Sequence, residues 1–209
     1  MTVSAKTVAL VANGAIDDLT VISPLIKSHD YIIAVDGGLV YCDKMNIFPT
    51  LIIGDLDSLP SDLLAKYSHI PVSRYPVDKN ETDMELALRI ACKPGVERVT
   101  LFGALGNRID HTMYNLYLLQ RYSNLTRIET ERETLFCVTG PTNISCYPGQ
   151  TISFFPHGEL AAGIFSKGLK WELSDATFNK DFMSISNVCL SDLVHIDVKK
   201  GILLCSLLR

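Results

Sequence analysis

The sequence predicts an α/β N-terminal domain with a mostly parallel sheet, Rossmann-like but without a P-loop, followed by a small all-β, sandwich-like C-terminal domain. Three observations support this prediction. The first half alternates short, continuous apolar runs with helical patterns, as expected for parallel strands buried on both faces. Neither GxxxxGK[ST] nor GxGxxG occurs, which excludes the common phosphate-binding loops. The second half has short apolar runs separated by Gly and Pro turns, which is typical of antiparallel strands.

Four apolar runs of the first half are expected to be strands, and each ends at a polar or glycine turn: 8–12, 31–35, 51–53 and 99–102. Thr82 and Glu85 form a capping-box pattern that opens a helix. Residues at helical spacing then follow, namely Met84, Ala87, Leu88 and Ala91. A second helix is expected to start near Asp110, which can cap it. Its period is continued by Met113, Leu116 and Tyr117.

The second half contains four further runs that are expected to be strands: 134–139, 151–155, 194–198 and 202–208. Strand–helix alternation before them and turn-rich strands after about residue 125 divide the chain. We therefore expect a catalytic α/β domain at 1–125 and a β domain at 126–209.

Composition limits the classes of function. The net charge is −4 and the pI is about 5.7, which argues against a nucleic-acid partner because such proteins usually carry a basic stripe. No apolar stretch is long enough for a membrane span, and no signal-peptide pattern is found. The six cysteines are scattered without a CxxC pair, so reduced thiols are expected. Together these features predict a soluble, cytoplasmic protein.

Polar and glycine residues follow the ends of the expected parallel strands. They are Asn13, Asp36, the pair Asp55 and Asp57, and the glycines 103 and 106. Each alone is an ordinary turn residue. In open α/β sheets, however, ligands bind beyond the carboxyl ends of the strands. The set as a whole therefore predicts a binding site on one edge of the sheet.

The carboxylates in these loops predict a Mg²⁺ site for nucleotide phosphates. Asp55 and Asp57 are two residues apart and can reach one hard cation. Asp78 and Asp83 add acidic groups, although Asp83 also suits the positive N-terminus of a helix.

Basic residues near these carboxylates are candidates for phosphate contacts. Arg108 can clamp phosphate oxygens with two hydrogen bonds, and Lys79 can assist as a point charge. His111 either bonds a neighbour in the first turn of the helix or contacts the ligand.

Five spaced motifs resemble the thiamin pyrophosphokinase family, in order and over nearly the whole chain. They are Gly54-Asp55-x-Asp57-Ser58, Asp78-Lys79-Asn80-x-Thr82-Asp83, Gly103-x-x-Gly106-x-Arg108-x-Asp110-His111, Ser166-Lys167-Gly168-Leu169-Lys170-Trp171-x-Leu173 and Ser184-Ile185-Ser186-Asn187. Two positions depart from the family pattern. Asn80 stands where many members carry Asp, and Val188 stands where bacterial members often carry an acidic residue.

The resemblance implies a Mg²⁺-dependent ATP:thiamin diphosphotransferase that forms thiamin diphosphate and AMP. It implies a homodimer with a shared active site, in which the β domains help to form the thiamin pocket. Its catalytic and metal-binding aspartates are expected to be Asp55, Asp57 and Asp83, with Asp78 as a further metal ligand. The nucleotide is expected to contact Asn13, Asp36, Lys79, Thr82, Arg108, Asp110 and His111. The thiamin contacts are expected to be Trp171, Ser186 and Asn187.

Other functions stay open at this point. A related enzyme could diphosphorylate a different hydroxymethyl compound, such as a reduced pterin. A Mg²⁺-dependent phosphohydrolase would share the Asp55-x-Asp57 pattern, but it usually has Thr where this chain has Leu59. A thiamin or nucleotide sensor without turnover is a third alternative. Trp171, which suits a flat cationic ligand, is also compatible with a half-buried core position.

Overall fold

The computed structural model of the chain describes residues 6–57, 59–75 and 80–209. The chain divides into two compact units. One unit is Met1–Leu118 with Ile128–Glu131, and the other is Leu119–Arg127 with Arg132–Arg209. The boundary predicted at residue 125 lies within the stretch where the chain passes between the units.

The first unit is built on a parallel sheet, as the sequence predicts, and its strand order is β5-β1-β2-β3-β4. Its strands are β1 (Thr7–Val11), β2 (Tyr31–Val35), β3 (Leu51–Gly54), β4 (Val72–Arg74) and β5 (Arg98–Phe102). β4 is not among the strands expected from the sequence. The chain moves outward from β1 to β4 and then returns to the other side of β1 as β5. The strand order therefore reverses between β1 and β5.

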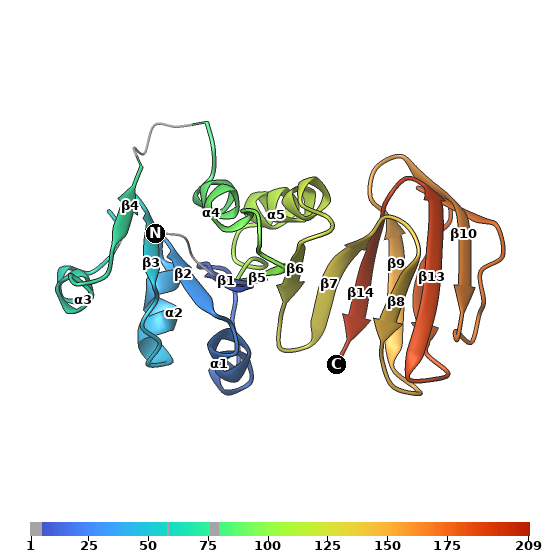
Figure 1. The fold of residues 1–209 in the computed structure, drawn as a ribbon, viewed down its shortest axis with the longest axis horizontal. Helices are drawn as coiled ribbons and strands as arrows, with labels where there is room; N and C mark the ends of the chain where they lie inside the picture. The colour runs from blue at the N-terminus through green and yellow to red at the C-terminus, as the bar shows by residue number, and fades with distance from the viewer. Residues whose placement is uncertain (1–5, 58, 76–79) are drawn as a thin grey trace. The chain divides into compact units, whose positions relative to one another are not determined.

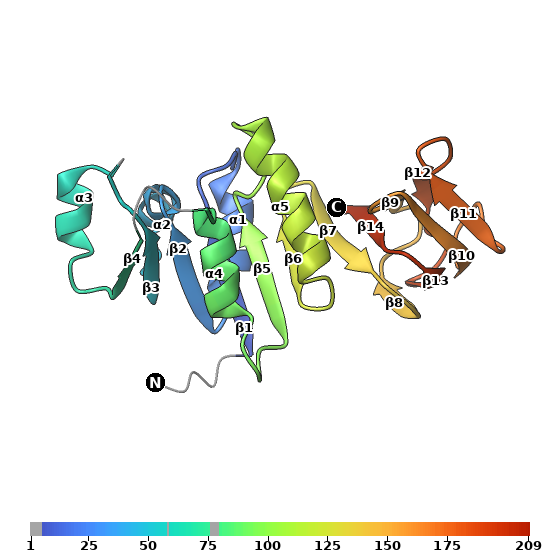
Figure 2. The same ribbon diagram turned by 90° about the horizontal axis from the view of Figure 1, so that it is seen from above.

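Helices cover both faces of this sheet. They are α1 (Leu19–Lys27), α2 (Gly38–Lys44), α3 (Ser61–Lys66), α4 (Asp83–Ala91) and α5 (Ile109–Arg121). Figures 1 and 2 show α4 and α5 on one face and α1 and α2 on the other. The core under α1 and α2 includes Ile22, Ile26 and Leu39, which pack on Val11 and Ala34 of the sheet. Both faces of β1, β2, β3 and β5 are thus largely buried, which explains their continuous apolar runs, whereas the edge strand β4 is mostly exposed.

The helix faces follow the predicted pattern in α4 but not in α5. In α4, Met84, Ala87, Leu88 and Ala91 are buried, as expected. In α5, Met113 and Tyr117 are exposed, and the buried side chains are Asn115, Leu118 and Leu119. The expected face was wrong because apolar residues surround most of this helix, so that their spacing does not single out one side.

The second unit consists of antiparallel strands in two groups, β12-β9-β14-β7 and β11-β10-β13-β8. Their bounds are β7 (Glu133–Val138), β8 (Thr142–Ser145), β9 (Thr151–Pro156), β10 (Leu160–Lys167), β11 (Ala176–Asn179), β12 (Ser184–Val188), β13 (Leu193–Lys200) and β14 (Leu203–Leu208); β6 (Thr126–Glu129) precedes them. Side chains of both groups share one core, for example Phe154 of β9, Phe178 of β11 and Ile196 of β13.

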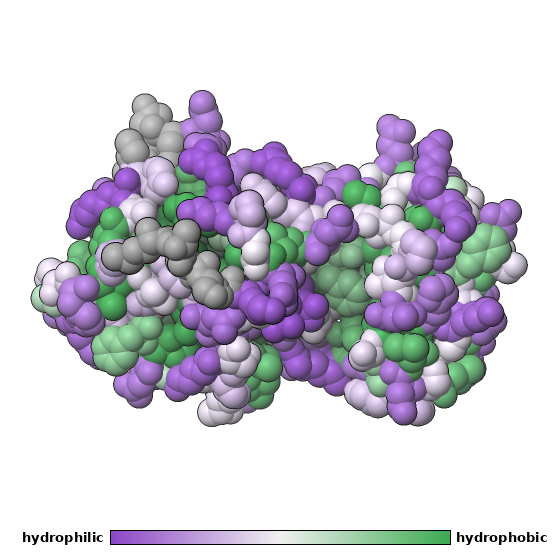
Figure 3. All heavy atoms as spheres, viewed as in Figure 1, coloured by the Kyte–Doolittle hydropathy of each residue, from purple (hydrophilic) through white to green (hydrophobic). Residues whose placement is uncertain are grey.

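The surface of the second unit is not uniformly polar. Figure 3 shows hydrophobic side chains reaching its surface among hydrophilic ones. The exposed large hydrophobic residues of this unit include Trp171, Phe182, Ile185 and Leu190. Among the described residues, no helix has the length and apolar composition needed to cross a bilayer.

Candidate active site

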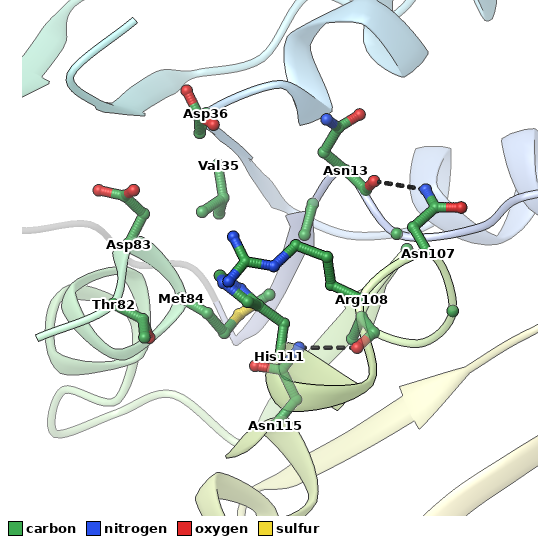
Figure 4. A pocket seen from close by; sticks show the side chains of 15 residues that line it. Asn13, Val35, Asp36, Thr82, Asp83, Met84, Asn107, Arg108, His111 and Asn115 are labelled. Atoms are coloured by element: carbon green, nitrogen blue, oxygen red, sulfur yellow. Dashed lines mark hydrogen bonds between the residues drawn. The ribbon is translucent and has the colours of Figure 1, made fainter. Parts of the chain in front are cut away.

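A pocket of about 280 Å³ opens at the carboxyl ends of the parallel strands. It lies beside the point where the strand order reverses, which is where open α/β sheets usually bind ligands. Its walls come from the loops after β1, β2 and β5, the start of α4, and the loop and first turns of α5. The predicted site residues among its lining are Asn13, Asp36, Thr82, Asp83, Arg108 and His111 (Figure 4).

Glycines let the loops at this edge approach one another closely. The Gly14 amide donates a 2.6 Å hydrogen bond to the carbonyl of Gly103. A Cβ on Gly14 would lie 2.4 Å from that oxygen, so a larger residue cannot be placed there without moving backbone. A Cβ on Gly37 would lie 2.5 Å from Nδ2 of Asn13. Because these two glycines have no side chain, Asn13 and the loop after β5 can lie together at the same rim of the pocket.

Asp36 occupies a constrained position at the end of β2. Its φ is 47°, in the left-handed region that residues other than glycine seldom adopt. The Asp36 amide donates to the carbonyl of Ile53 on β3 at 2.7 Å, which fixes this backbone. Figure 4 shows the Asp36 carboxylate at the rim of the pocket. Such backbone outliers gather at functional sites, and this one places a carboxylate among the pocket residues.

The start of α4 brings a helix N-terminus to the pocket. Thr82 is the N-cap, and its hydroxyl accepts the Glu85 amide at 3.2 Å, as the capping-box pattern predicts. The Glu85 carboxylate accepts a hydrogen bond from Tyr114. Asp83 is the first residue of the helix and lines the pocket. The positive end of the helix dipole therefore faces the cavity beside a carboxylate.

Arg108 and Asp110 form a bidentate ion pair at the opposite side. Arg108 Nη2 and Nε lie 2.5 and 3.1 Å from the two carboxylate oxygens of Asp110. The hydrogen bonds from Arg108 are the main reason that the pKa of Asp110 falls to about 2. Asp110 is the second residue of α5, because the helix starts at Ile109, one residue earlier than expected. Oδ1 of Asp110 accepts the His111 amide of the first turn at 3.0 Å, as expected of a residue that caps the helix start, and both carboxylate oxygens also hold Arg108.

Two asparagines of this region are not among the site residues predicted from the sequence. Asn107 donates from Nδ2 to the Asn13 carbonyl at 3.1 Å (Figure 4) and so ties the α5 loop to the β1 loop. Asn115 is 7% exposed and donates to the Ala104 carbonyl at 2.7 Å. Asn115 follows His111 by four residues on α5, so that both face the pocket. The four-residue spacing from His111 is the sequence feature from which Asn115 could have been predicted.

Asp55 and Asp57 lie after β3, outside the residues that line the pocket. The Asp57 amide donates to Oδ1 of Asp55 at 3.1 Å, which closes a tight turn. Between them, Leu56 has a φ of 65° and is buried in the core at 2% exposure. The buried Leu56 anchors the turn and leaves the two carboxylates at the surface edge. Since β3 pairs with β2, this turn follows the strand next to Asp36.

The chemistry of these side chains suits a hard cation. Carboxylate oxygens are the donors that Mg²⁺ prefers, and Mg²⁺ usually keeps several waters or phosphate oxygens. In the part of the chain that the structure describes, no three acidic, imidazole or thiol groups are assembled closely enough to hold a metal alone. The predicted residues Asp78 and Lys79 lie outside the described residues. The donors present fit a Mg²⁺ whose coordination is completed by a phosphate ligand.

The three predicted thiamin contacts meet in the second unit. Trp171 is 55% exposed, and the ammonium of Lys170 lies 4.6 Å from its ring centroid. Asn187 is buried and bonds the backbone of Trp171 at 3.2 and 2.7 Å. Ser186 is exposed beside it, and its amide donates to Ser153 Oγ at 2.9 Å. At 55% exposure Trp171 lies outside the core of this unit, with room for a ligand to contact its ring.

Two family models match this chain, one in each half, and both describe the same family. A family model described as thiamin pyrophosphokinase, catalytic domain, matches residues 22–130. A second, described as thiamin pyrophosphokinase, vitamin B1 binding domain, matches residues 135–203. These matches cover both units and extend over most of the chain.

Individual relatives agree with the family models. Thiamine pyrophosphokinase of Bacillus subtilis is 26% identical over 95% of this chain and 97% of its own length. Its crystal structure superposes with a TM-score of 0.86, covering 98% of this chain and 99% of that one. Thiamine pyrophosphokinase 1 of Oryza sativa subsp. japonica is 26% identical over 73% of this chain, but over only 64% of its own length.

Proposed function

This chain belongs to the thiamin pyrophosphokinase family, and from this membership we propose how its residues transfer the diphosphoryl group of ATP to thiamin. The products are thiamin diphosphate and AMP. The roles proposed for the individual residues rest on the pocket beside the point where the strand order reverses. It places the cationic Arg108 opposite the carboxylates of Asp36 and Asp83.

The nucleotide occupies this pocket in the proposal, as in a Rossmann-like sheet. Its phosphates face the positive N-terminal end of α4, which Thr82 caps, and Arg108 clamps them from the other side. Asn13 and His111 supply further polar contacts. Apolar lining from Ala12, Val35, Met84 and Ala104 suits the less polar parts of the nucleotide. Lys79 is proposed as an additional phosphate contact.

Mg²⁺ is proposed to be held by Asp55, Asp57 and Asp83, with Asp78 as a further ligand. When bound, it neutralises phosphate charge that the carboxylates would otherwise repel. The fit rests on the donor chemistry of the turn after β3 and of the α4 N-terminus. The ion is expected to bind together with ATP, since the described carboxylates do not form a complete site by themselves.

The reaction needs positioning and charge neutralisation rather than a covalent enzyme intermediate. The thiamin hydroxyl oxygen attacks the β-phosphorus of ATP, and the bond from that phosphorus to the α,β-bridging oxygen breaks. AMP leaves with the bridging oxygen. The hydroxyl proton passes to a carboxylate of the set Asp55, Asp57 and Asp83, which acts as general base. Arg108 stabilises the negative charge on the transferred oxygens.

The acceptor side of the site is proposed to lie on the second unit, with Trp171 stacking on the cationic thiazolium and Ser186 beside it. A homodimer is proposed, in which a second copy completes the site. A mixture of inactive Asp83→Ala and inactive Trp171→Ala proteins tests this directly. Activity is restored on mixing if the two halves of a site come from different copies. Full inactivity of a verified mixed dimer would refute the shared site.

The product decides the function. With ATP, Mg²⁺ and thiamin, we expect AMP and thiamin diphosphate in equal amounts, measured by ³¹P NMR and chromatography. Formation of ADP alone, or no turnover with thiamin, would refute the assignment. Turnover with a reduced pterin in place of thiamin would instead indicate the related diphosphokinase, and a trapped phosphoaspartate would indicate a phosphohydrolase. Ligand binding without any turnover would indicate a sensor.

The cellular setting is proposed to be the reducing cytoplasm. All six cysteines are free thiols in the structure, and Cys42, Cys189 and Cys205 are buried. Burial raises the pKa of the Cys42 thiol to about 12, so that it stays protonated and unreactive. Fractionation of cells that express the protein tests the location.

A further inference from the structure

The side chain of Asn187 holds the backbone of Trp171 at two points. The Trp171 amide donates to Oδ1 of Asn187 at 3.2 Å, and Nδ2 of Asn187 donates to the Trp171 carbonyl at 2.7 Å. Oδ1 also accepts the Val188 amide at 2.9 Å. Asn187 is only 1% exposed. The side-chain amide of Asn187 therefore pairs with the backbone of Trp171 in the way that the backbone of a neighbouring β-strand would.

A β-bulge explains why Asn187 points this way. On β12, Ser184 pairs with Phe154 and Asn187 pairs with Ile152, so one strand advances three residues while the other advances two. The extra residue is accommodated where Ser186 adopts a φ of 59°. Bulges re-aim side chains out of the regular alternation. Here the bulge turns Asn187 inward, toward the Trp171 segment.

The pairing by Asn187 continues an existing backbone ladder. Leu169 bridges Cys189, and the Lys170 amide donates to the Val188 carbonyl at 2.8 Å. At the next residue, Trp171, the Asn187 amide takes over from the backbone of β12. The indole ring itself stays 55% exposed. The segment is thus fixed up to the α-carbon of Trp171, and its ring is presented to solvent.

We infer that Asn187 is a positioning residue, which fixes Trp171 as a stacking surface for the acceptor and, in place of the direct thiamin contact expected from the family resemblance, does not itself touch the acceptor. This inference rests on the proposed function, because it takes Trp171 as the acceptor contact. An unfixed tryptophan would lose conformational freedom on binding, at a cost of about 0.5–1.5 kcal/mol per immobilised side chain. Fixing the backbone that carries the ring in advance removes part of this cost.

Fluorescence tests the inference without interference, because Trp171 is the only tryptophan of the chain. In Asn187→Ala we expect a lower anisotropy of the indole emission and stronger quenching by acrylamide. The KM for thiamin should rise about 2- to 12-fold, with kcat changed less than about twofold. Asn187→Ser replaces this variant if the alanine protein does not fold. The control is Val198→Ala, a cavity in the core of the same unit, which should lower stability and leave the anisotropy unchanged.

Asn187→Asp separates positioning from direct contact. A carboxylate that touched the cationic ring would attract it and lower the KM for thiamin. Under the inference the KM rises, because the new oxygen faces the Trp171 carbonyl and loses the 2.7 Å hydrogen bond. Unchanged anisotropy in Asn187→Ala, or a lower KM in Asn187→Asp, would overturn the inference. Absence of thiamin-dependent AMP from the wild type would overturn the proposed function instead, while anisotropy would still decide whether Asn187 fixes Trp171.

Discussion

The phenol of Tyr114 on α5 donates a 2.7 Å hydrogen bond to the carboxylate of Glu85 on α4. These two helices carry opposite sides of the pocket. Asp83 begins α4, two residues before Glu85, and His111 and Asn115 lie on either side of Tyr114 in the sequence of α5. The hydrogen bond therefore connects the helix that presents the carboxylate to the helix that presents the basic and amide groups.

Tyr114→Phe should lower both stability and turnover. Hydrogen bonds to charged groups contribute about 1.5–3 kcal/mol, and we expect the free energy of unfolding to fall by an amount near the lower figure because the pair is only partly buried. kcat should fall more than the KM for ATP rises, since the pocket still forms but its two sides are less well aligned. Urea unfolding and steady-state kinetics measure these effects. Tyr147→Phe, at an exposed position of the second unit, is the control. An unchanged kcat in Tyr114→Phe would show that the bridge does not align the site.

Asp110→Asn tests whether Asp110 orients Arg108 or competes with phosphate for it. Arg108 is largely exposed and its guanidinium is held by both oxygens of Asp110. We expect the KM for ATP to rise by up to about tenfold, because a guanidinium that Asp110 no longer holds must be ordered when the nucleotide binds. A lower KM would identify Asp110 as a competitor. Because the pKa of Asp110 is lowered to about 2, its pair with Arg108 is lost only as the pH falls through that value. The acid limb of the activity profile must therefore come from another group.

The sequence predicted β1, β2, β3 and β5 because burial on both faces leaves continuous apolar runs. It did not predict β4, a three-residue strand whose first and last residues are exposed. It did not predict α1, where Pro24 stands inside the helix and reads as a break. Pro24 removes one backbone hydrogen bond from the helix, because it has no amide hydrogen. Burial of Ile22 and Ile26, on either side of it, offsets this loss. Local sequence patterns thus failed where tertiary packing outweighs propensity.

The site was predictable in part for a similar reason. Asn13, Asp36, Asp83 and Arg108 follow strand ends or begin helices, so their place on one rim follows from the sheet. The inward turn of Asn187 depends instead on a bulge against β9, more than thirty residues away in sequence, and no local pattern reports such a pairing.

Stability should decline on mild acidification because of His29. Its ring bonds the Leu25 carbonyl and Thr100 Oγ1 at 2.9 and 2.8 Å, and burial is the main cause that lowers its pKa below 6.5. The unfolded chain therefore binds a proton that the folded protein does not, and stability present above about pH 6.5 is lost as the pH falls below it. The slope cannot exceed about 1.4 kcal/mol per pH unit for one group. Urea unfolding of His29→Gln should show a flatter pH dependence, and His69→Gln, at an exposed position, should match the wild type. An equal slope in His29→Gln would refute this origin.

Lys170→Met should strengthen binding of thiamin. The Lys170 ammonium lies over the Trp171 ring, 4.6 Å from its centroid, where it competes with a cationic ligand and repels it. An exposed cation–π contact is worth about 0.5–1 kcal/mol, so the KM for thiamin should fall roughly 2- to 5-fold. Quenching of Trp171 fluorescence by thiamin gives the affinity independently of turnover. Lys180→Met, another exposed lysine of the unit, should change neither value. A higher KM in Lys170→Met would mean that the ammonium contacts the substrate favourably.

Asp83→Ala should abolish most of the activity while the fold persists. Asp83 lines the pocket at the first position of α4, so its loss removes a proposed Mg²⁺ ligand; Thr82 still caps the helix. Loss of a metal ligand or preorganised charge partner costs on the order of 10²-fold or more in kcat. The Mg²⁺ concentration for half-maximal rate should also rise, which a defect in folding or in thiamin binding would not produce. Asp62→Ala, in the first turn of α3 and outside the pocket, provides the matched loss of a carboxylate from a helix start. If Asp83→Ala and Asp62→Ala had the same kcat and Mg²⁺ dependence, Asp83 would have no part in the metal site.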